Sequence, residues 1–129
     1  MKKCAILILF FLIMMGLYAQ TSVIEVDAYQ LALEYDENPY RADVKYKNKI
    51  LTVTGIVENI VSTVSVRDRY YISFITPAYP VATDVFAYIH PSQHEKLAFI
   101  SRGQIVTISG KCDGKWSFMV NILDSYIVE

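Results

Sequence analysis

After Lys49 the apolar residues of this chain fall at every second position, and this alternation constrains the fold more than any other feature. Leu51, Val53 and Val57 alternate with residues expected to face outward. A period of two places the apolar side chains on one face of an extended strand. The pattern predicts five strands at residues 51–58, 69–76, 83–89, 104–109 and 115–128, with a short helix at 92–99 between the third and the fourth.

Five short strands with a helix between the third and the fourth are the layout of the OB-fold, a five-stranded Greek-key barrel. The chain is therefore predicted to be mainly β. In such a barrel one side of each strand fills a closed interior, which explains the alternation. The predicted interior side chains are Leu51, Val53, Val57, Ile72, Phe74, Val85, Ala87, Ile89, Val106, Ile108, Phe118, Val120 and Ile122.

Glycines mark two special positions in this predicted barrel. Gly55 lies inside the first strand, where it costs stability unless the strand bends sharply or another backbone approaches it. Residues 110–114 end in Asp113-Gly114, a strong hairpin signal, and predict a tight connection between the last two strands.

A helical segment precedes the barrel. Asp27 and Gln30 resemble a capping box, which predicts the start of a helix. Its apolar stripe, at helical spacing, consists of Ala28, Leu31, Ala32 and Tyr35. Asn38-Pro39 ends the helix, because the residue before a proline is pushed out of the helical region. The stripe has to pack on the barrel to be buried.

The first 19 residues have the pattern of a secretory signal peptide. Lys2 and Lys3 form a positive start, residues 4–19 carry no charge, and the small Ala19 stands at the predicted cut. The protein is thus predicted to reach the periplasm or the extracellular space. An uncleaved membrane anchor is the alternative, although a spanning helix needs about 20 apolar residues. The predicted organisation is a signal peptide at 1–19, a helical segment at 20–48 and a barrel at 49–129.

The exported chain would be acidic and would hold a single cysteine. Removing Lys2 and Lys3 from a chain of formal charge −1 leaves −3 (−1 − 2). Nucleic-acid binders usually carry a strongly basic patch instead. Once the signal peptide with Cys4 is removed, Cys112 has no intramolecular partner, so it is either a buried thiol or an exposed one that pairs with a second chain. Burial is favoured, because a lone reactive thiol is a liability in an oxidising compartment.

The sequence contains no recognisable catalytic or metal-binding motif. His90 and His94 are spaced to share a helical face, but a zinc site needs a third protein ligand, and the exported chain has no other His and no second Cys. Nothing arranges a nucleophile with a base and an orienting group, and no phosphate-binding glycine motif occurs. We predict no enzyme activity, no metal and no cofactor.

Several short motifs occur in a distinctive order. They are Leu33-Glu34-Tyr35, Asn38, Ala42-Asp43, Tyr46-Lys47, Leu51-Thr52-Val53-Thr54-Gly55 and Gly103-Gln104-Ile105-Val106-Thr107-Ile108-Ser109-Gly110. Over nearly all of the exported chain, their order resembles the tRNA_anti-like family of exported bacterial OB-fold proteins. The resemblance implies a barrel and export, but no ligand. Relatives often carry a second cysteine near the last strand, where this chain has Ser125, so a family disulfide to Cys112 is impossible here.

The candidate binding residues are aromatic. If Ile72 and its inward neighbours fill the interior, Tyr71, Phe86 and Tyr88 point outward on adjacent strands, with Arg69 at the rim. OB-folds bind oligonucleotides and oligosaccharides on that face. Alternatively the rings pack under the N-terminal helix, and we favour this arrangement because the helix has to bury its stripe.

These observations predict a noncatalytic exported binding module of the bacterial cell envelope. Its partner would be another envelope protein, a peptide or an oligosaccharide. The alternative is a single-stranded nucleic-acid-binding protein, which the barrel and its aromatic residues support and which the acidic charge and export oppose.

Overall fold

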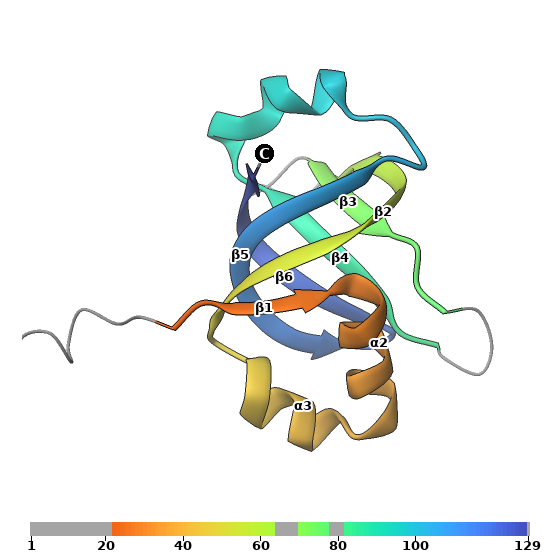
Figure 1. Ribbon diagram of the computed structural model, residues 1–129, viewed down its shortest axis with the longest axis vertical. Helices are drawn as coiled ribbons and strands as arrows, with labels where there is room; N and C mark the ends of the chain where they lie inside the picture. Colours follow the sequence, from red (N-terminus) through yellow and green to blue (C-terminus); the bar gives the residue numbers. More distant parts are fainter. Residues whose placement is uncertain (1–21, 64–69, 78–81, 129) are drawn as a thin grey trace, which may run out of the picture.

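The computed structural model describes residues 22–63, 70–77 and 82–128 (Figure 1). The strands are β1 (Ile24–Asp27), β2 (Ile50–Ser62), β3 (Tyr70–Phe74), β4 (Asp84–Ile89), β5 (Ile105–Trp116) and β6 (Met119–Val128). The helices are α2 (Ala28–Glu37), α3 (Pro39–Tyr46) and the 3-10 helix η1 (Pro91–Phe99). No helix in the described part of the chain is long and apolar enough to cross a membrane.

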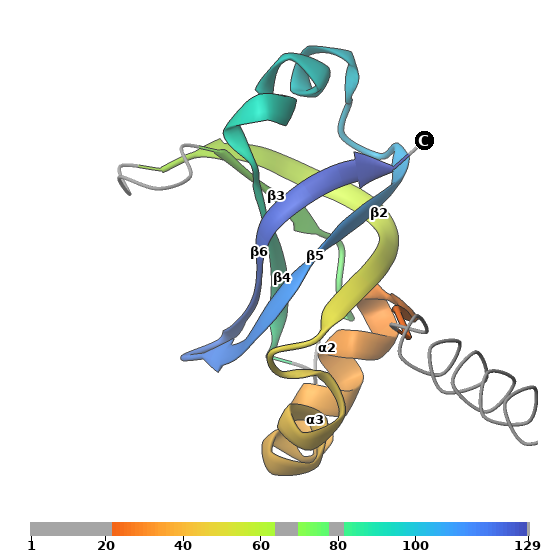
Figure 2. The same cartoon turned by 90° about the vertical axis from the view of Figure 1, so that its left-hand side faces the viewer.

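Five of the strands close into a barrel. β2, β3 and β4 pair antiparallel in sequence order, β4 pairs parallel with β6, and β6 pairs antiparallel with β5. The first half of β2 pairs with β5 and completes the circle. η1 lies at one end of the barrel, between β4 and β5 in the chain, and α2 and α3 lie at the other end (Figures 1 and 2). The predicted five-stranded OB-fold is confirmed.

β1 is a sixth strand that the sequence analysis did not predict. It runs parallel to β2, with Ile24 opposite Leu51 and Asp27 opposite Thr54. The same segment of β2 pairs with β5 on its other edge. Ile24 and Val26 are half-buried against the core, whereas Glu25 and Asp27 are exposed. A run of four residues is too short for its alternation to be read as a strand without knowledge of a partner.

The two N-terminal helices begin where the sequence predicts caps and breaks. The carboxylate of Asp27 accepts a hydrogen bond from the backbone N–H of Gln30 at 2.7 Å, and α2 begins at the next residue. Asn38 ends α2 and caps α3, because its side-chain oxygen accepts from the N–H of Arg41 at 3.0 Å. Pro39 occupies the first turn of α3, where its missing N–H costs nothing.

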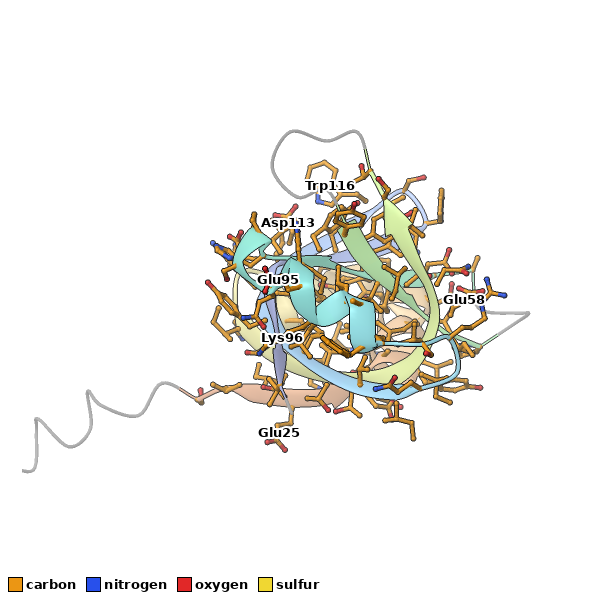
Figure 3. All side chains as sticks on the ribbon, turned by 90° about the horizontal axis from the view of Figure 1, so that it is seen from above. Glu25, Glu58, Glu95, Lys96, Asp113 and Trp116 are labelled. Atoms are coloured by element: carbon orange, nitrogen blue, oxygen red, sulfur yellow. The ribbon has the colours of Figure 1, made fainter. Side chains whose placement is uncertain are left out.

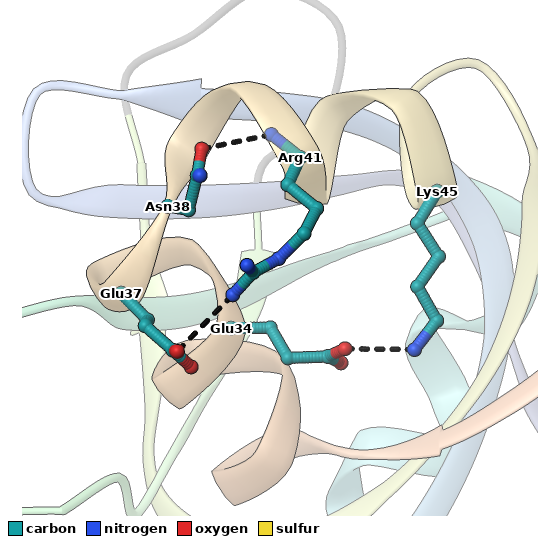
Figure 4. A network of polar contacts seen from close by, with 5 residues as sticks. All are labelled: Glu34, Glu37, Asn38, Arg41 and Lys45. Carbon is teal, nitrogen blue, oxygen red and sulfur yellow. Dashed lines mark hydrogen bonds and ion pairs between the residues drawn. The ribbon is translucent and has the colours of Figure 1, made fainter.

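Ion pairs join α2 and α3 across this break (Figure 4). Arg41 pairs with Glu37 at 3.2 Å, and the Lys45 ammonium donates to Glu34 at 2.7 Å. The Tyr46 hydroxyl donates to the same Glu34 carboxylate. The pairs involve partly or largely exposed groups, so each contributes little stability. Burial of the apolar residues holds the helices on the barrel.

The predicted interior is confirmed with one exception. Every side chain assigned to it is buried except Phe118, which is 50% exposed. The helical stripe of α2 joins the same core, and so do Ala42 and Tyr46 of α3. The helix pair therefore closes one end of the barrel by packing against residues that face its interior.

The connection between the last two strands is not where the sequence predicts it. β5 continues through residues 110–114, and the turn lies at Ser117 and Phe118, where Ser117 has a φ of 58°. Gly114, with a φ of 81°, lies at a register shift inside the β5–β6 ladder, which is a β-bulge. A glycine with positive φ fits a hairpin turn and a bulge equally well, so the Asp-Gly signal was misassigned. Phe118 is exposed because it lies at the turn.

Side chains, rather than another backbone, approach Gly55. A Cβ at this position would lie 2.6 Å from Cδ1 of Phe74 and 2.8 Å from Cβ of Ala28. Both groups belong to the core. The missing side chain of Gly55 thus makes room for α2 and for the Phe74 ring on β3.

Candidate binding surface

The predicted aromatic residues form a ladder on the outer face of β3 and β4. Tyr71 lies directly opposite Tyr88, and Phe86 lies two pairs further along, opposite Ser73. The ring centroids of Tyr71 and Phe86 are 4.5 Å apart at an interplanar angle of 28°, and those of Tyr71 and Tyr88 are 5.2 Å apart at 43°. All three side chains are half-buried. Contacts among the rings hold them in place before any ligand arrives, which lowers the entropic cost of binding.

The expectation that α2 covers these rings is wrong. The buried residues of α2 pack with Leu51, Phe74 and other interior side chains at the end of the barrel. Ala28 reaches Gly55 and Phe74 there. The helical stripe is therefore buried without the outer face of β3 and β4.

Two more apolar side chains, which the sequence analysis missed, extend this face. Asp84 of β4 lies opposite Met119 of β6, and Met119 lies opposite Trp116 of β5. Phe86 is opposite Asn121 in the neighbouring row. Since paired residues share a face of the sheet, Met119 and Trp116 lie on the same side as Phe86. We call Tyr71, Phe86, Tyr88, Met119 and Trp116 the aromatic surface.

Trp116 escaped the sequence analysis because the turn was assigned to residues 110–114. With a turn there, Phe118 and Val120 were predicted to be interior residues of the last strand, and Trp116 received no predicted role. In the structure the turn lies between Trp116 and Met119, and Trp116 is 57% exposed. Its indole N–H donates to the carboxylate of Asp113 at 3.0 Å and to the carbonyl oxygen of the same residue at 3.2 Å. These bonds orient the ring.

The polar side chains described on this face include the carboxylates of Asp84 and Asp113, and Lys111, opposite Leu123 of β6, places a cation further along it. Asp84 accepts a hydrogen bond from the Thr76 hydroxyl at 3.4 Å, and Asp113 holds Trp116. Oδ1 of Asn121, beside Phe86, is buried without a hydrogen-bond partner in the described structure. Arg69, the predicted rim cation, lies outside the described residues. The β5–β6 hairpin projects on the same side of the barrel as the facing ends of β2 and β3 (Figure 2).

The two histidines hold separate structural contacts. Nδ1 of His90 accepts from the N–H of Ser92 at 3.2 Å, and its ring stacks on Tyr126 with centroids 5.0 Å apart. Nε2 of His94 donates to the carbonyl oxygen of Ile89 at 3.1 Å. Within the described residues, no group of three His, Cys, Asp or Glu side chains is placed to hold a metal ion.

Cys112 is a buried free thiol inside β5, not part of a turn. Its sulfur lies 3.7 Å from the hydroxyl oxygen of Tyr35, which donates to Oδ1 of Asp43 at 2.9 Å. Burial raises the pKa of the Cys112 thiol and the pKa of the Tyr35 hydroxyl, because each anion would lose its hydration. The sulfur is shielded by α2 and has a structural role between the barrel and the helix pair.

This network predicts that the fold loses stability in alkali. In the unfolded chain the thiol of Cys112 ionises near its ordinary pKa of 9.0 and the hydroxyl of Tyr35 near 10.0. The folded chain keeps both protons, so stability is intact below pH 9 and falls as the pH rises above it. Each group that the fold keeps neutral lowers the free energy of unfolding by about 1.4 kcal/mol for every pH unit above its ordinary pKa. Urea midpoints at neutral and alkaline pH test this, and the Tyr35→Phe/Cys112→Ala variant should lose less on the same shift. Equal losses in the two chains would contradict it.

The closed five-stranded barrel defines an OB-fold protein with an outward aromatic ladder on β3 and β4. A model of the tRNA_anti-like family matches residues 13–125. The chain belongs to the tRNA_anti-like family. No curated protein matches the sequence significantly.

Solved structures show the same fold at low sequence identity. A candidate nucleic acid-binding lipoprotein from Klebsiella pneumoniae is 17% identical with a TM-score of 0.64, over 83% of this chain and 92% of that one. The yeast Stn1 and Ten1 structure matches at 11% identity and a TM-score of 0.47, over 84% of this chain and 64% of that one. The first similarity supports the OB-fold, and the second is too distant to add to it.

Proposed function

We propose that this protein is a noncatalytic binding module of the bacterial cell envelope that takes its partner on the aromatic surface. The partner is an oligosaccharide, a peptide or another envelope protein. The observation that carries the proposal is the row of outward rings that runs from Tyr71 and Phe86 to Trp116. OB-folds use this face, between the loops that flank it, to bind extended ligands.

Among these partners an oligosaccharide fits the described chemistry best. Sugar C–H groups pack on the faces of aromatic rings, and sugar hydroxyls donate hydrogen bonds to carboxylates and amides. Asp84 and Asp113 supply carboxylate acceptors around Phe86 and Trp116. The same carboxylates repel a polyanion. Export is supported by the signal pattern of the first 19 residues and by the structural similarity to the Klebsiella lipoprotein.

Single-stranded nucleic acid is the second candidate. It is favoured by the structural similarity to the Klebsiella protein, a candidate nucleic acid binder, and by the ability of aromatic rings to stack on bases. The acidic charge of the exported chain and the carboxylates beside the rings oppose it. Binding through phosphate contacts falls steeply with salt, whereas stacking of a neutral sugar does not.

Trp116 gives a direct test, because it is the only tryptophan in the chain. Titration with a neutral hexasaccharide of N-acetylglucosamine, and separately with a labelled deoxythymidine oligonucleotide, should change its fluorescence if the ligand reaches the aromatic surface. We expect the saccharide to bind with little dependence on salt. Saturable, salt-sensitive binding of the oligonucleotide alone would establish the second candidate. No response to either would exclude both the saccharide and the nucleic acid, and would leave a peptide or an envelope protein as the partner.

Phe86→Ala should weaken saccharide binding by roughly tenfold to a hundredfold, since a stacked ring contributes about 1–3 kcal/mol. Calorimetry measures the loss without relying on fluorescence. The matched control is Phe99→Ala, which removes an exposed phenylalanine from η1 at the end of the barrel away from α2. If both variants bind as tightly as the unmodified protein, the aromatic surface is not the binding site.

A further inference from the structure

A second surface, independent of the proposed function, lies on the outer faces of β1, β2 and β5. Strand pairing places Asp27, Thr54 and Thr107 in one row across the three strands, and Ile56 beside Ile105 in the next row. Glu25 of β1 and Trp116 of the aromatic surface are seen on opposite sides of the barrel (Figure 3). The two surfaces are therefore separate.

The apolar part of this second surface is a hollow of about 390 Å³. Four large side chains that line it are exposed: Tyr29, Ile56, Ile75 and Ile105. Ile105 is 68% exposed although its neighbour Val106 is in the core. Isolated apolar residues are normal on a protein surface, but four around one hollow mark an interaction site. We call these four residues the isoleucine hollow.

Carboxylates border the isoleucine hollow at one end. A second hollow of about 500 Å³, lined by Glu25, Thr52 and Thr107 among others, shares Asp27 and Thr54 with it. Glu25 is exposed. In the described part of the chain, no lysine or arginine forms an ion pair with Glu25 or Asp27. The surface thus combines an apolar hollow with a negative end, where Asp27 caps α2 and no described lysine or arginine pairs with either carboxylate.

We propose that this surface binds an extended segment of another protein that carries apolar side chains next to a lysine or arginine. The row of Asp27 and Thr54 lies two residues along β2 from Ile56, which corresponds to about 7 Å. An extended segment spans that distance with its own residues i and i+2. Its apolar side chains enter the isoleucine hollow, and its cation reaches Glu25 and Asp27.

A second copy of this chain fits the surface less well. If two copies met through this face about a two-fold axis, the acidic end of each would cover the opposite end of the other. That end is formed by Ile56, Ile75 and Ile105, and the described residues that line it include no lysine or arginine. Burying a carboxylate against uncharged groups is costly. The charge distribution therefore favours a basic partner over self-association.

Two matched peptides test this proposal on the full chain. Both peptides alternate isoleucine with threonine. They differ at one position, two residues from the isoleucines, where one peptide carries lysine and the other carries glutamate. We expect the lysine peptide to bind at least about tenfold more tightly at low salt, because the end of the surface is acidic. Binding of the lysine peptide should shift the backbone NMR signals of Ile56 and Ile105 and leave the signal of the Trp116 indole unchanged.

Single substitutions with matched controls locate the site. Ile105→Thr, which keeps a β-branched residue in the strand, should weaken the lysine peptide about tenfold, and Glu25→Gln should weaken it and reduce its salt dependence. The controls Val44→Thr and Glu95→Gln change exposed residues elsewhere and should have no effect.

Equal binding of the two peptides, binding of neither, or binding that survives Ile105→Thr would overturn the proposal. So would a dimer that Ile105→Thr dissociates, which would assign the surface to a second copy. Saccharide binding at the aromatic surface is measured separately, so the two proposals fail independently.

Discussion

Replacing Gly110 with alanine should lower the free energy of unfolding by about 3 kcal/mol, the upper end of the usual cost of overpacking. A Cβ there would lie 2.6 Å from Oγ of Ser125, 2.7 Å from the carbonyl oxygen of Leu123 and 2.8 Å from Cγ2 of Ile122. All three residues belong to β6. A backbone oxygen cannot move aside without shifting the strand, and Gly110 also pairs with Leu51 of β2, where the barrel closes. One methyl group would thus disturb two ladders at once.

Urea denaturation measures this effect, and the exposed neighbour Lys111 provides a matched control. Lys111→Ala should leave the midpoint nearly unchanged. Combining Gly110→Ala with Ser125→Ala removes the contact with Oγ but leaves the clash with the backbone, so only part of the lost stability should return. A Gly110→Ala chain as stable as the original would mean that β5 and β6 are not this close.

Gly55→Val should destabilise the fold by about 1–3 kcal/mol, again through overpacking. Its Cβ would meet the Phe74 ring at 2.6 Å and Cβ of Ala28 at 2.8 Å. Unlike the contacts of Gly110, these are with side chains, which can give way by shifting the ring or the start of α2. We therefore expect a smaller loss than at Gly110, and a smaller loss still for Gly55→Ala.

A compensating substitution tests the cause. Phe74→Leu shortens the group that a new side chain would meet, so it should cost less in the Gly55→Val background than in the original chain. A double-mutant cycle built on thermal or urea unfolding gives this coupling directly. Unchanged stability of Gly55→Val, or strict additivity in the cycle, would show that α2 and β3 do not meet at this glycine.

Alternation predicted the inside of the barrel well because it depends only on the local geometry of a strand. Leu51, Val53 and Ile108 are buried as their positions in the period require. The same rule placed Tyr71, Phe86 and Tyr88 outward, and in the structure the Tyr71 ring contacts the other two. The stripe of α2 was predicted for the same reason, since helical spacing alone defines its buried face.

The failures occur where an outcome depended on a distant partner. β1 exists because β2 offers it an edge, and its four residues carry too little pattern of their own. Gly114 adopts a positive φ as expected, but the pairing of β5 with β6 makes it a bulge rather than a turn. The sequence analysis placed the turn a few residues too early and gave Trp116 no role, so it missed part of the candidate site.

The sequence by itself determined the spacing of the apolar side chains. That spacing defines the strands of the five-stranded barrel and the buried stripe of α2. These follow from interactions between residues close in the chain, whose spacing is visible in one dimension. Only the tertiary structure decided where α2 packs, where the β5–β6 hairpin turns and which outward residues come together as surfaces. Those outcomes depend on contacts between segments far apart in the chain, and such contacts leave no periodic trace in either segment alone.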